Sequence, residues 1–155
     1  MKIKPASPTE LKSILDILDR SGLPSIDCEE HLETFFVIEV NGNIVAAGGL
    51  EITDSFGLLR SIAVLSENRN KGIGRKLYQH LEKQAMKAGV QKLYLLTNTA
   101  KDYFSKLGFC SVPRSSVPTC IQETRQFREL CPESATVMFR NLTEITEEKE
   151  LLRTP

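Results

Sequence analysis

Apolar and polar residues repeat along the chain with two different periods, which predict helices in some segments and strands in others. Between residues 11 and 18, apolar residues recur every three or four positions, the spacing of one face of a helix. The preceding "SPTE" (residues 7–10) has the S-x-x-E pattern of a capping box, with proline at the favoured first helical position. We therefore expect a first helix that ends at Ser21-Gly22.

Uninterrupted apolar runs predict the strands of a sheet. Two of these runs flank Asn41-Gly42-Asn43, and an Asn-Gly between apolar runs is a strong signal for a hairpin. In chain order, the expected strands are "MKIKP", "TFFVIEV", "IVAAGGLEI", "FGLLRSIAVL", "KLYLLT" and "SATVMFRNL".

Further helices are expected between these strands. A long one begins at Gly72 and ends near Ala88, because apolar residues mark one face of that stretch and basic residues the other. "TAKDYFSKLG" predicts a short helix with Thr99 as its cap and Gly108 as its end. Two other segments have helical patterns, "SIDCEEHLE" and "CIQETRQFREL", whereas "FCSVPRSSVP" is typical of a loop. Together the elements predict one α+β domain with a mixed, mostly antiparallel sheet at residues 1–142, followed by a charged, mobile tail at 143–155.

Composition narrows the class of protein. The 20 basic and 20 acidic residues give a net charge of zero, which argues against nucleic acid as a partner. No run approaches the ~20 apolar residues of a membrane span, so we expect no membrane partner. The first ten residues lack the apolar region of a signal peptide, so a cytoplasmic location is expected.

The cysteines and histidines give no metal-binding pattern. The four cysteines have no C-x-x-C spacing, so we expect them to stay reduced and to bind no metal. His31 and His80 each stand without a partner motif, and we interpret both as structural or exposed.

Two glycines at the start of the long helix need a physical reason, because glycine inside a helix costs roughly 1 kcal/mol relative to alanine. The segment "RNKGIG" (residues 69–74) is neither a Rossmann fingerprint, since Leu77 stands at the third glycine position, nor a P-loop. Backbone N–H groups at a helix N-terminus bind anions, and glycines let a bulky phosphate approach. From the glycine pair alone, a solvated turn with a basic face remains the alternative.

The wider sequence resembles the central half of the GCN5-related N-acetyltransferase (GNAT) family, over roughly residues 35 to 110. The family's R/Q-x-x-G-x-G/A motif matches Arg69, Gly72 and Gly74. "FSKLGF" matches its Y-x-x-x-G-F ending with one change, at Phe104.

This resemblance implies acetyl-CoA as co-substrate, bound in a cleft formed by a splayed pair of strands. The glycine loop would cradle the pyrophosphate, and the main chain of the preceding strand would pair with the pantetheine arm. The implied contacts are Ile62, Ala63, Val64, Arg69, Asn70, Lys71, Gly72, Ile73, Gly74, Arg75, Asn98 and Phe104.

The implied reaction moves an acetyl group to an amine, which must be neutral to attack. Glu51 is the candidate base or water-orienting residue, because a carboxylate among apolar neighbours has a raised pKa. A solvent-facing strand end is the alternative for this residue. Strand N–H groups near Val64 are candidate donors to the oxyanion.

Phe104 stands where the family usually has a tyrosine that protonates the departing thiolate. Tyr103 is adjacent but lies about 100° around a helix, so it either reaches the thiolate or simply packs. A thiol of pKa about 8.5 also leaves tolerably well as an anion.

The C-terminal segment resembles, more narrowly, the acetyltransferases associated with arsenic-resistance operons, and Phe104 is shared with N-acetylglutamate synthase-like members. The residues that carry the narrower resemblance are Arg114, Pro118, Gln126-Phe127, Cys131-Pro132 and Ser134-Ala135. It suggests a small, amino-acid-like substrate. Arg60 and Arg114, with Ser61, are the candidates to bind its carboxylate, because arginine binds carboxylates with two hydrogen bonds. Either arginine alone is equally compatible with a surface role.

The sequence leaves three candidate functions to be tested. The first is an N-acetyltransferase for a small molecule, an amino acid or analogue with a link to arsenic resistance. The others are a protein acetyltransferase, acting on lysine or an N-terminus, and a non-catalytic acetyl-CoA sensor, which Phe104 keeps open. A monomer and a homodimer are both compatible with the sequence.

Overall fold

A computed structural model describes residues 1–130 and 134–143. The expected tail therefore lies, apart from Thr143, outside the described residues, as do Cys131 and Pro132. The chain forms two compact units, one made of residues 1–51 and 59–84 and the other of residues 52–58 and the chain from Ala85 onward.

The fold is α+β, with a mixed sheet whose hydrogen-bonded neighbours follow the order β1-β2-β3-β4-β5-β7-β6. The helices that accompany it are α1 (Leu11–Arg20), α2 (Ile73–Lys87), α3 (Lys101–Lys106) and α4 (Thr119–Gln122). The strands are β1 (Lys2–Pro5), β2 (Phe35–Val40), β3 (Asn43–Thr53), β4 (Phe56–Val64), β5 (Lys92–Thr97), β6 (Cys110–Ser111) and β7 (Thr136–Asn141). Except for β6, these are the strands that the apolar runs predicted.

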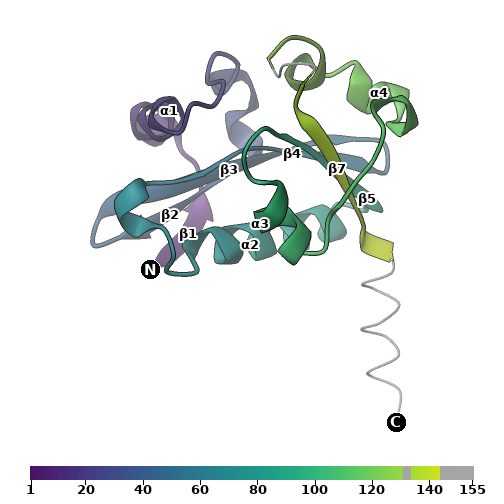
Figure 1. The fold of residues 1–155 in the computed structure, drawn as a ribbon. Helices are drawn as coiled ribbons and strands as arrows, with labels where there is room; N and C mark the ends of the chain where they lie inside the picture. The colour runs from purple at the N-terminus through teal and green to yellow at the C-terminus, as the bar shows by residue number, and fades with distance from the viewer. Residues whose placement is uncertain (131–133, 144–155) are drawn as a thin grey trace. The chain divides into compact units, whose positions relative to one another are not determined.

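In the first unit, neighbouring residues of a strand pack against two different helices, because successive side chains of a strand point to opposite faces of the sheet. Val37 and Ala47 belong to a cluster with α1. One position earlier on β2, Phe36 contacts the His80 ring of α2 at a centroid distance of 4.5 Å. Figure 1 shows the result, with α1 and α2 on opposite sides of β2 and β3.

The adjacent glycines of β3 have a packing reason. A Cβ atom on Gly48 would meet Ile62, Leu77 and Leu81 at 3.2 Å, on the α2 side. A Cβ atom on Gly49 would lie 2.8 Å from the ring of Phe35, which is fully buried. The pair "GG" therefore lets a helix and an aromatic ring approach the strand from its two faces.

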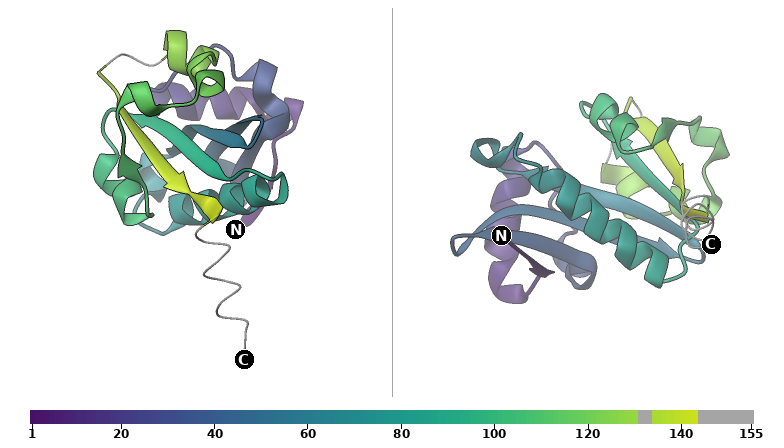
Figure 2. Two further views of the ribbon diagram at one scale, coloured as in Figure 1. Left: turned by 90° about the vertical axis from the view of Figure 1, so that its right-hand side faces the viewer. Right: turned by 90° about the horizontal axis from the view of Figure 1, so that it is seen from below.

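The second unit is built on β5. This strand pairs in parallel with Phe56–Leu58, the start of β4, and antiparallel with β7, which pairs in turn with β6. Figure 2 shows β5 and β7 side by side. The core beneath them contains Leu58, Tyr94, Val117, Ile121 and Val137.

Several local predictions need correction. Thr99 is not the cap of α3, because the Ala100 N–H bonds to Oγ1 of Thr97 instead. "FCSVPRSSVP" is not wholly irregular, since it contains β6 and a 3-10 turn at Arg114–Ser116. "SIDCEEHLE" forms a 3-10 helix, η2 (Glu29–Thr34), rather than an α-helix. The predicted capping box at Ser7 and Glu10 is confirmed, but it begins a 3-10 turn, Pro8–Glu10, that leads into α1.

None of the helices in the described part of the chain is long and apolar enough to cross a membrane.

Candidate active site

A buried ion pair lies at the centre of the first unit. Arg60 of β4 donates two hydrogen bonds to the carboxylate of Asp27, at 2.6 and 2.5 Å, and neither side chain is exposed to solvent. The Arg60 guanidinium also lies 5.7 Å from the centroid of the Phe35 ring, and its Nε donates to Oγ of Ser61 at 3.3 Å. The interpretation of Arg60 as a surface residue is therefore wrong.

Glu51, near the end of β3, lies beside this pair. Its side chain is 11% exposed, so it is not a solvent-facing strand end. Oε2 lies 3.7 Å from Nη1 of Arg60 and accepts no hydrogen bond from any of the described residues. Oε2 of Glu51 is thus a hydrogen-bond acceptor that lies, largely buried, beside charged side chains.

His31 of η2 completes the group, which we call the charged cluster: Asp27, His31, Glu51 and Arg60. Nε2 of His31 lies 3.2 Å from Oε1 of Glu51 and 3.7 Å from Oδ2 of Asp27. At 31% exposure, it is the most exposed of the four side chains. The described residues include no group of three or more acidic, cysteine or histidine side chains arranged to hold a metal ion.

The two carboxylates of the charged cluster differ in pKa. Burial alone would raise the pKa of Asp27, but the hydrogen bonds and positive charge of Arg60 lower it overall. Burial raises the pKa of Glu51, and the positive charges of Arg60 and His31 offset this only in part. Burial also raises the pKa of the neighbouring Cys28 thiol, to about 11, so this thiol stays neutral.

Sequence reasoning missed Asp27 and His31. Their spacing of four residues on a helical segment was a signal, since such residues share a face. Their partners on β3 and β4 lie far along the chain, and nothing local to "DCEEH" points to them. The structure also gives Arg60, a candidate for the substrate carboxylate, an internal carboxylate partner in Asp27.

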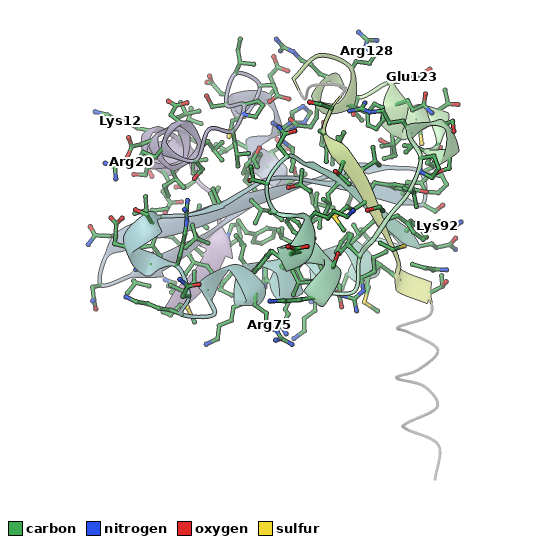
Figure 3. All side chains as sticks on the ribbon, viewed as in Figure 1. Lys12, Arg20, Arg75, Lys92, Glu123 and Arg128 are labelled. Carbon is green, nitrogen blue, oxygen red and sulfur yellow. The ribbon has the colours of Figure 1, made fainter. Side chains whose placement is uncertain are left out.

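The glycine loop between β4 and α2 has left-handed backbone at two positions. Asn70 and Gly72 both have left-handed backbone, with φ of 64° and 78°, and no atom lies within 4 Å of where a Gly72 Cβ would be. The backbone N–H of Lys76 donates the first helical hydrogen bond, to the Gly72 carbonyl. The backbone N–H groups of residues 73–75 therefore have no partner within the helix and point out of its first turn. Arg75 projects from the solvent side of α2 (Figure 3) and Lys71 is exposed as well.

Arg69 has a second role that its sequence position did not indicate. Its Nε donates to the carbonyl of Val64 at 3.0 Å, which ties the loop to the end of β4. The side chains of Ile62 and Ala63 face opposite ways, toward α2 and α1 respectively. A ligand would therefore meet this part of β4 through its main chain. Ser61 just before it has a φ of 56°, which bends the strand.

In the second unit, Phe104 is buried and its ring lies 5.9 Å from that of Phe109. Tyr103 is 41% exposed, with its ring edge-on to Phe104 at 5.3 Å. Asn98 is exposed in the turn after β5. Arg114 is half-buried, with its guanidinium 5.0 Å from the centroid of the Phe127 ring.

The sequence of this chain is similar to those of known acetyltransferases. A model of the acetyltransferase (GNAT) family matches residues 7–109, and the chain therefore belongs to this family. An uncharacterized N-acetyltransferase of Chlorobaculum tepidum is 32% identical over 90 residues, 57% of each chain. An amino-acid acetyltransferase of Pseudomonas fluorescens is 35% identical over 105 residues, which are 66% of this chain and 23% of that one.

The fold is also that of a larger enzyme. The N-acetylglutamate synthase of Neisseria gonorrhoeae, solved with coenzyme A and N-acetyl-glutamate, superposes with a TM-score of 0.80. Sequence identity is 20%, over 91% of this chain and 35% of that one. The chain thus spans 57% of the first relative, and 23% and 35% of the two larger proteins.

Proposed function

We propose that this protein transfers the acetyl group of acetyl-CoA to the amine of a small amino acid or amino-acid analogue. The observation that carries the proposal is Glu51, a buried carboxylate whose Oε2 accepts no hydrogen bond from the described residues. Membership of the family and the likeness to amino-acid acetyltransferases supply the reaction type and the substrate class.

Glu51 takes the proton that the substrate amine must lose. An amino acid carries an ammonium group at neutral pH, which cannot attack a thioester until it is deprotonated. Burial raises the pKa of Glu51 toward the range in which a carboxylate accepts a proton effectively. Water between Glu51 and the amine serves equally well, since one bridging molecule preserves the proton path.

Acetyl-CoA supplies an acetyl group that is already activated as a thioester. The residues that fit its pyrophosphate are those of the glycine loop, where the N–H groups of Ile73, Gly74 and Arg75 lie at the positive end of the α2 dipole. Lys71, Asn70 and the remaining nitrogens of Arg69 add donors beside them. The main chain of Ile62, Ala63 and Val64 pairs with the pantetheine arm and donates to the oxyanion. Asn98 and Phe104 remain the further cofactor contacts that the family resemblance implies.

The thiolate leaves without a dedicated acid. Phe104 has no proton to give, and the exposed Tyr103 ring is engaged edge-on with Phe104. A thiol pKa of about 8.5 makes the anion a tolerable leaving group.

Arg114 binds the substrate carboxylate, whereas Arg60 and Ser61 act indirectly, by fixing Asp27 and the bend in β4. Stacking on Phe127 holds the planar guanidinium in one orientation, as a two-pronged contact requires. If so, Arg114→Gln lowers kcat/KM for the amine about ten- to a hundredfold, the equivalent of a lost charge-assisted hydrogen bond. Arg114→Lys restores part of this loss, and the KM for acetyl-CoA stays unchanged.

The test is thiol release from acetyl-CoA over a panel of amines. The panel contains glutamate, aspartate, methionine, phosphinic and arsenical amino-acid analogues, a lysine-containing peptide and an N-terminal peptide. The C-terminal resemblance is the reason for including the arsenical analogues. Turnover with one or more of the small acids supports the proposal. Turnover with the peptides alone, or with none of the amines, overturns it.

A further inference from the structure

His31 is the most exposed member of the charged cluster. Asp27 and Arg60 are fully buried and Glu51 nearly so, whereas 31% of the His31 side chain is exposed. One side of its ring, at Nε2, faces Oε1 of Glu51 at 3.2 Å. The imidazole therefore touches both the buried carboxylate and the surrounding water.

The charges of the cluster make His31 more than a packing residue. Asp27 is ionised and its two oxygens are held by Arg60, so these two charges cancel. Glu51 is then the carboxylate of the cluster that has no two-hydrogen-bond partner, with Arg60 3.7 Å away on one side and His31 on the other. Cys28, which follows Asp27 in the chain, is neutral below a pKa of about 11. Glu51 and His31 are thus the two members that the Asp27–Arg60 pair leaves in contact with each other, at 3.2 Å between Oε1 and Nε2.

We propose that His31 is a positioning and proton-relay partner of Glu51, which orients the carboxylate and passes the proton from the substrate amine to solvent. The proposal rests on the proposed function, because it takes Glu51 as the base.

The proton moves in two balanced steps. First, one N–H bond of the substrate ammonium breaks and an O–H bond forms on the Glu51 carboxyl, which leaves a neutral amine and a neutral acid. Then the O–H bond breaks and an N–H bond forms at Nε2 of His31, which restores the Glu51 carboxylate and gives an imidazolium. The imidazolium releases a proton to water from its exposed edge. If the proton first arrives on Oε2, a half-turn of the carboxyl brings it to His31, and the last side-chain torsion of glutamate has broad, two-fold minima.

The experiment is chemical rescue of His31→Ala by imidazole in solution. With the best amine and saturating acetyl-CoA, we expect kcat/KM to fall about 10- to 100-fold, by analogy with the loss when a partner that orients a metal ligand is removed. Added imidazole should restore a large part of this loss with a saturable dependence, because the exposed side of His31 leaves a site that solvent reaches. A purely structural role would not respond to imidazole.

His80 provides the matched control, because it is the other histidine of the chain and packs on Phe36. His80→Ala should gain nothing from imidazole. Glu51→Gln should also gain nothing, because the relay then has no proton to receive. If His31→Ala is poorly folded, His31→Gln keeps the bulk of the side chain, and its rate should become dependent on buffer concentration.

Wild-type activity separates this inference from the proposed function. The inference is tested when the wild type is active and Glu51→Gln is inactive. It is then overturned if His31→Ala either keeps full activity or loses activity that imidazole does not restore, and if His31→Gln also shows no buffer dependence. If the wild type acetylates no amine, the proposed function and the relay are both wrong.

Discussion

Arg60 holds Asp27, 33 positions earlier in the chain, by two hydrogen bonds in a site from which water is excluded. Such a pair costs free energy to desolvate, so its presence is weak evidence for stability. Here it fixes the segment before η2 onto β4. The side chains of Glu51 and His31 are held against the same pair.

Removing one member of this pair should destabilise the protein strongly. Asp27→Ala leaves the Arg60 charge buried without its partner, and we expect a loss of about 3–5 kcal/mol in the free energy of unfolding. Urea denaturation at pH 7 measures it. Asp16→Asn is the matched control, because Asp16 and Arg20 form an exposed ion pair, for which a change below about 1 kcal/mol is expected. Equal losses in the two variants would show that burial of the Asp27 pair does not matter.

The two carboxylates of the charged cluster should affect the pH dependence of stability in opposite directions. Asp27 has a lowered pKa in the folded state, so its contribution is present above the unfolded value of about 3.9 and is lost as pH falls through the folded value. Glu51 has a raised pKa, so its contribution is most favourable below about pH 4.3 and declines as pH rises through the folded value.

Glu51→Gln should therefore stabilise the protein and inactivate it. Its advantage in unfolding free energy over the wild type should grow from pH 4 to pH 8, and kcat should fall about 10²–10⁴-fold, the scale of a lost general base. Thermal unfolding at several pH values, together with thiol release, checks both parts. A variant that keeps wild-type kcat would remove Glu51 from the chemistry.

Substitutions at two glycines should affect cofactor binding and stability separately. Valine at position 72 meets no neighbouring atom but is forced to a φ of 78°, a strain of roughly 1–2 kcal/mol, which should reshape the glycine loop. We expect the KM for acetyl-CoA to rise by about tenfold or more, with little change in Tm. Alanine at position 49 collides instead with Phe35, so it should cost about 1–3 kcal/mol of stability and leave that KM unchanged. A wild-type affinity for CoA in Gly72→Val would count against the phosphate cradle.

The parts of the fold that are coded locally could be predicted from the sequence, and those that depend on distant partners could not. The apolar spacing of α1 and the Asn41-Gly42 turn are complete signals within a few residues. The cap of α3 was misplaced by one residue, since the cap position is Ala100, whose N–H donates to Oγ1 of Thr97 and not to Thr99. The sequence predicted a raised pKa for Glu51 from apolar neighbours, and burial among charged side chains raises it instead, whereas the role of Arg60 depended on a carboxylate 33 residues away.

Tyr103 should be dispensable for catalysis. Its ring is edge-on to Phe104, and we expect Tyr103→Phe to keep this contact and most of the kcat. Steady-state kinetics with the best amine are sufficient. A drop of about 100-fold or more, as for a lost general acid, would show that Tyr103 protonates the leaving thiolate.

The central claim is that the acetyl group goes to the amine of a small molecule that also carries a carboxylate. Its most direct test compares the best free amino acid with the same compound amidated at its carboxyl group, by measuring the acetylated product after incubation with acetyl-CoA. We predict acetylation of the free acid with kcat/KM about ten- to a hundredfold above that of the amide, and a difference that largely disappears in Arg114→Gln. Equal rates for acid and amide in the wild type, or acetylation of neither, would contradict the account.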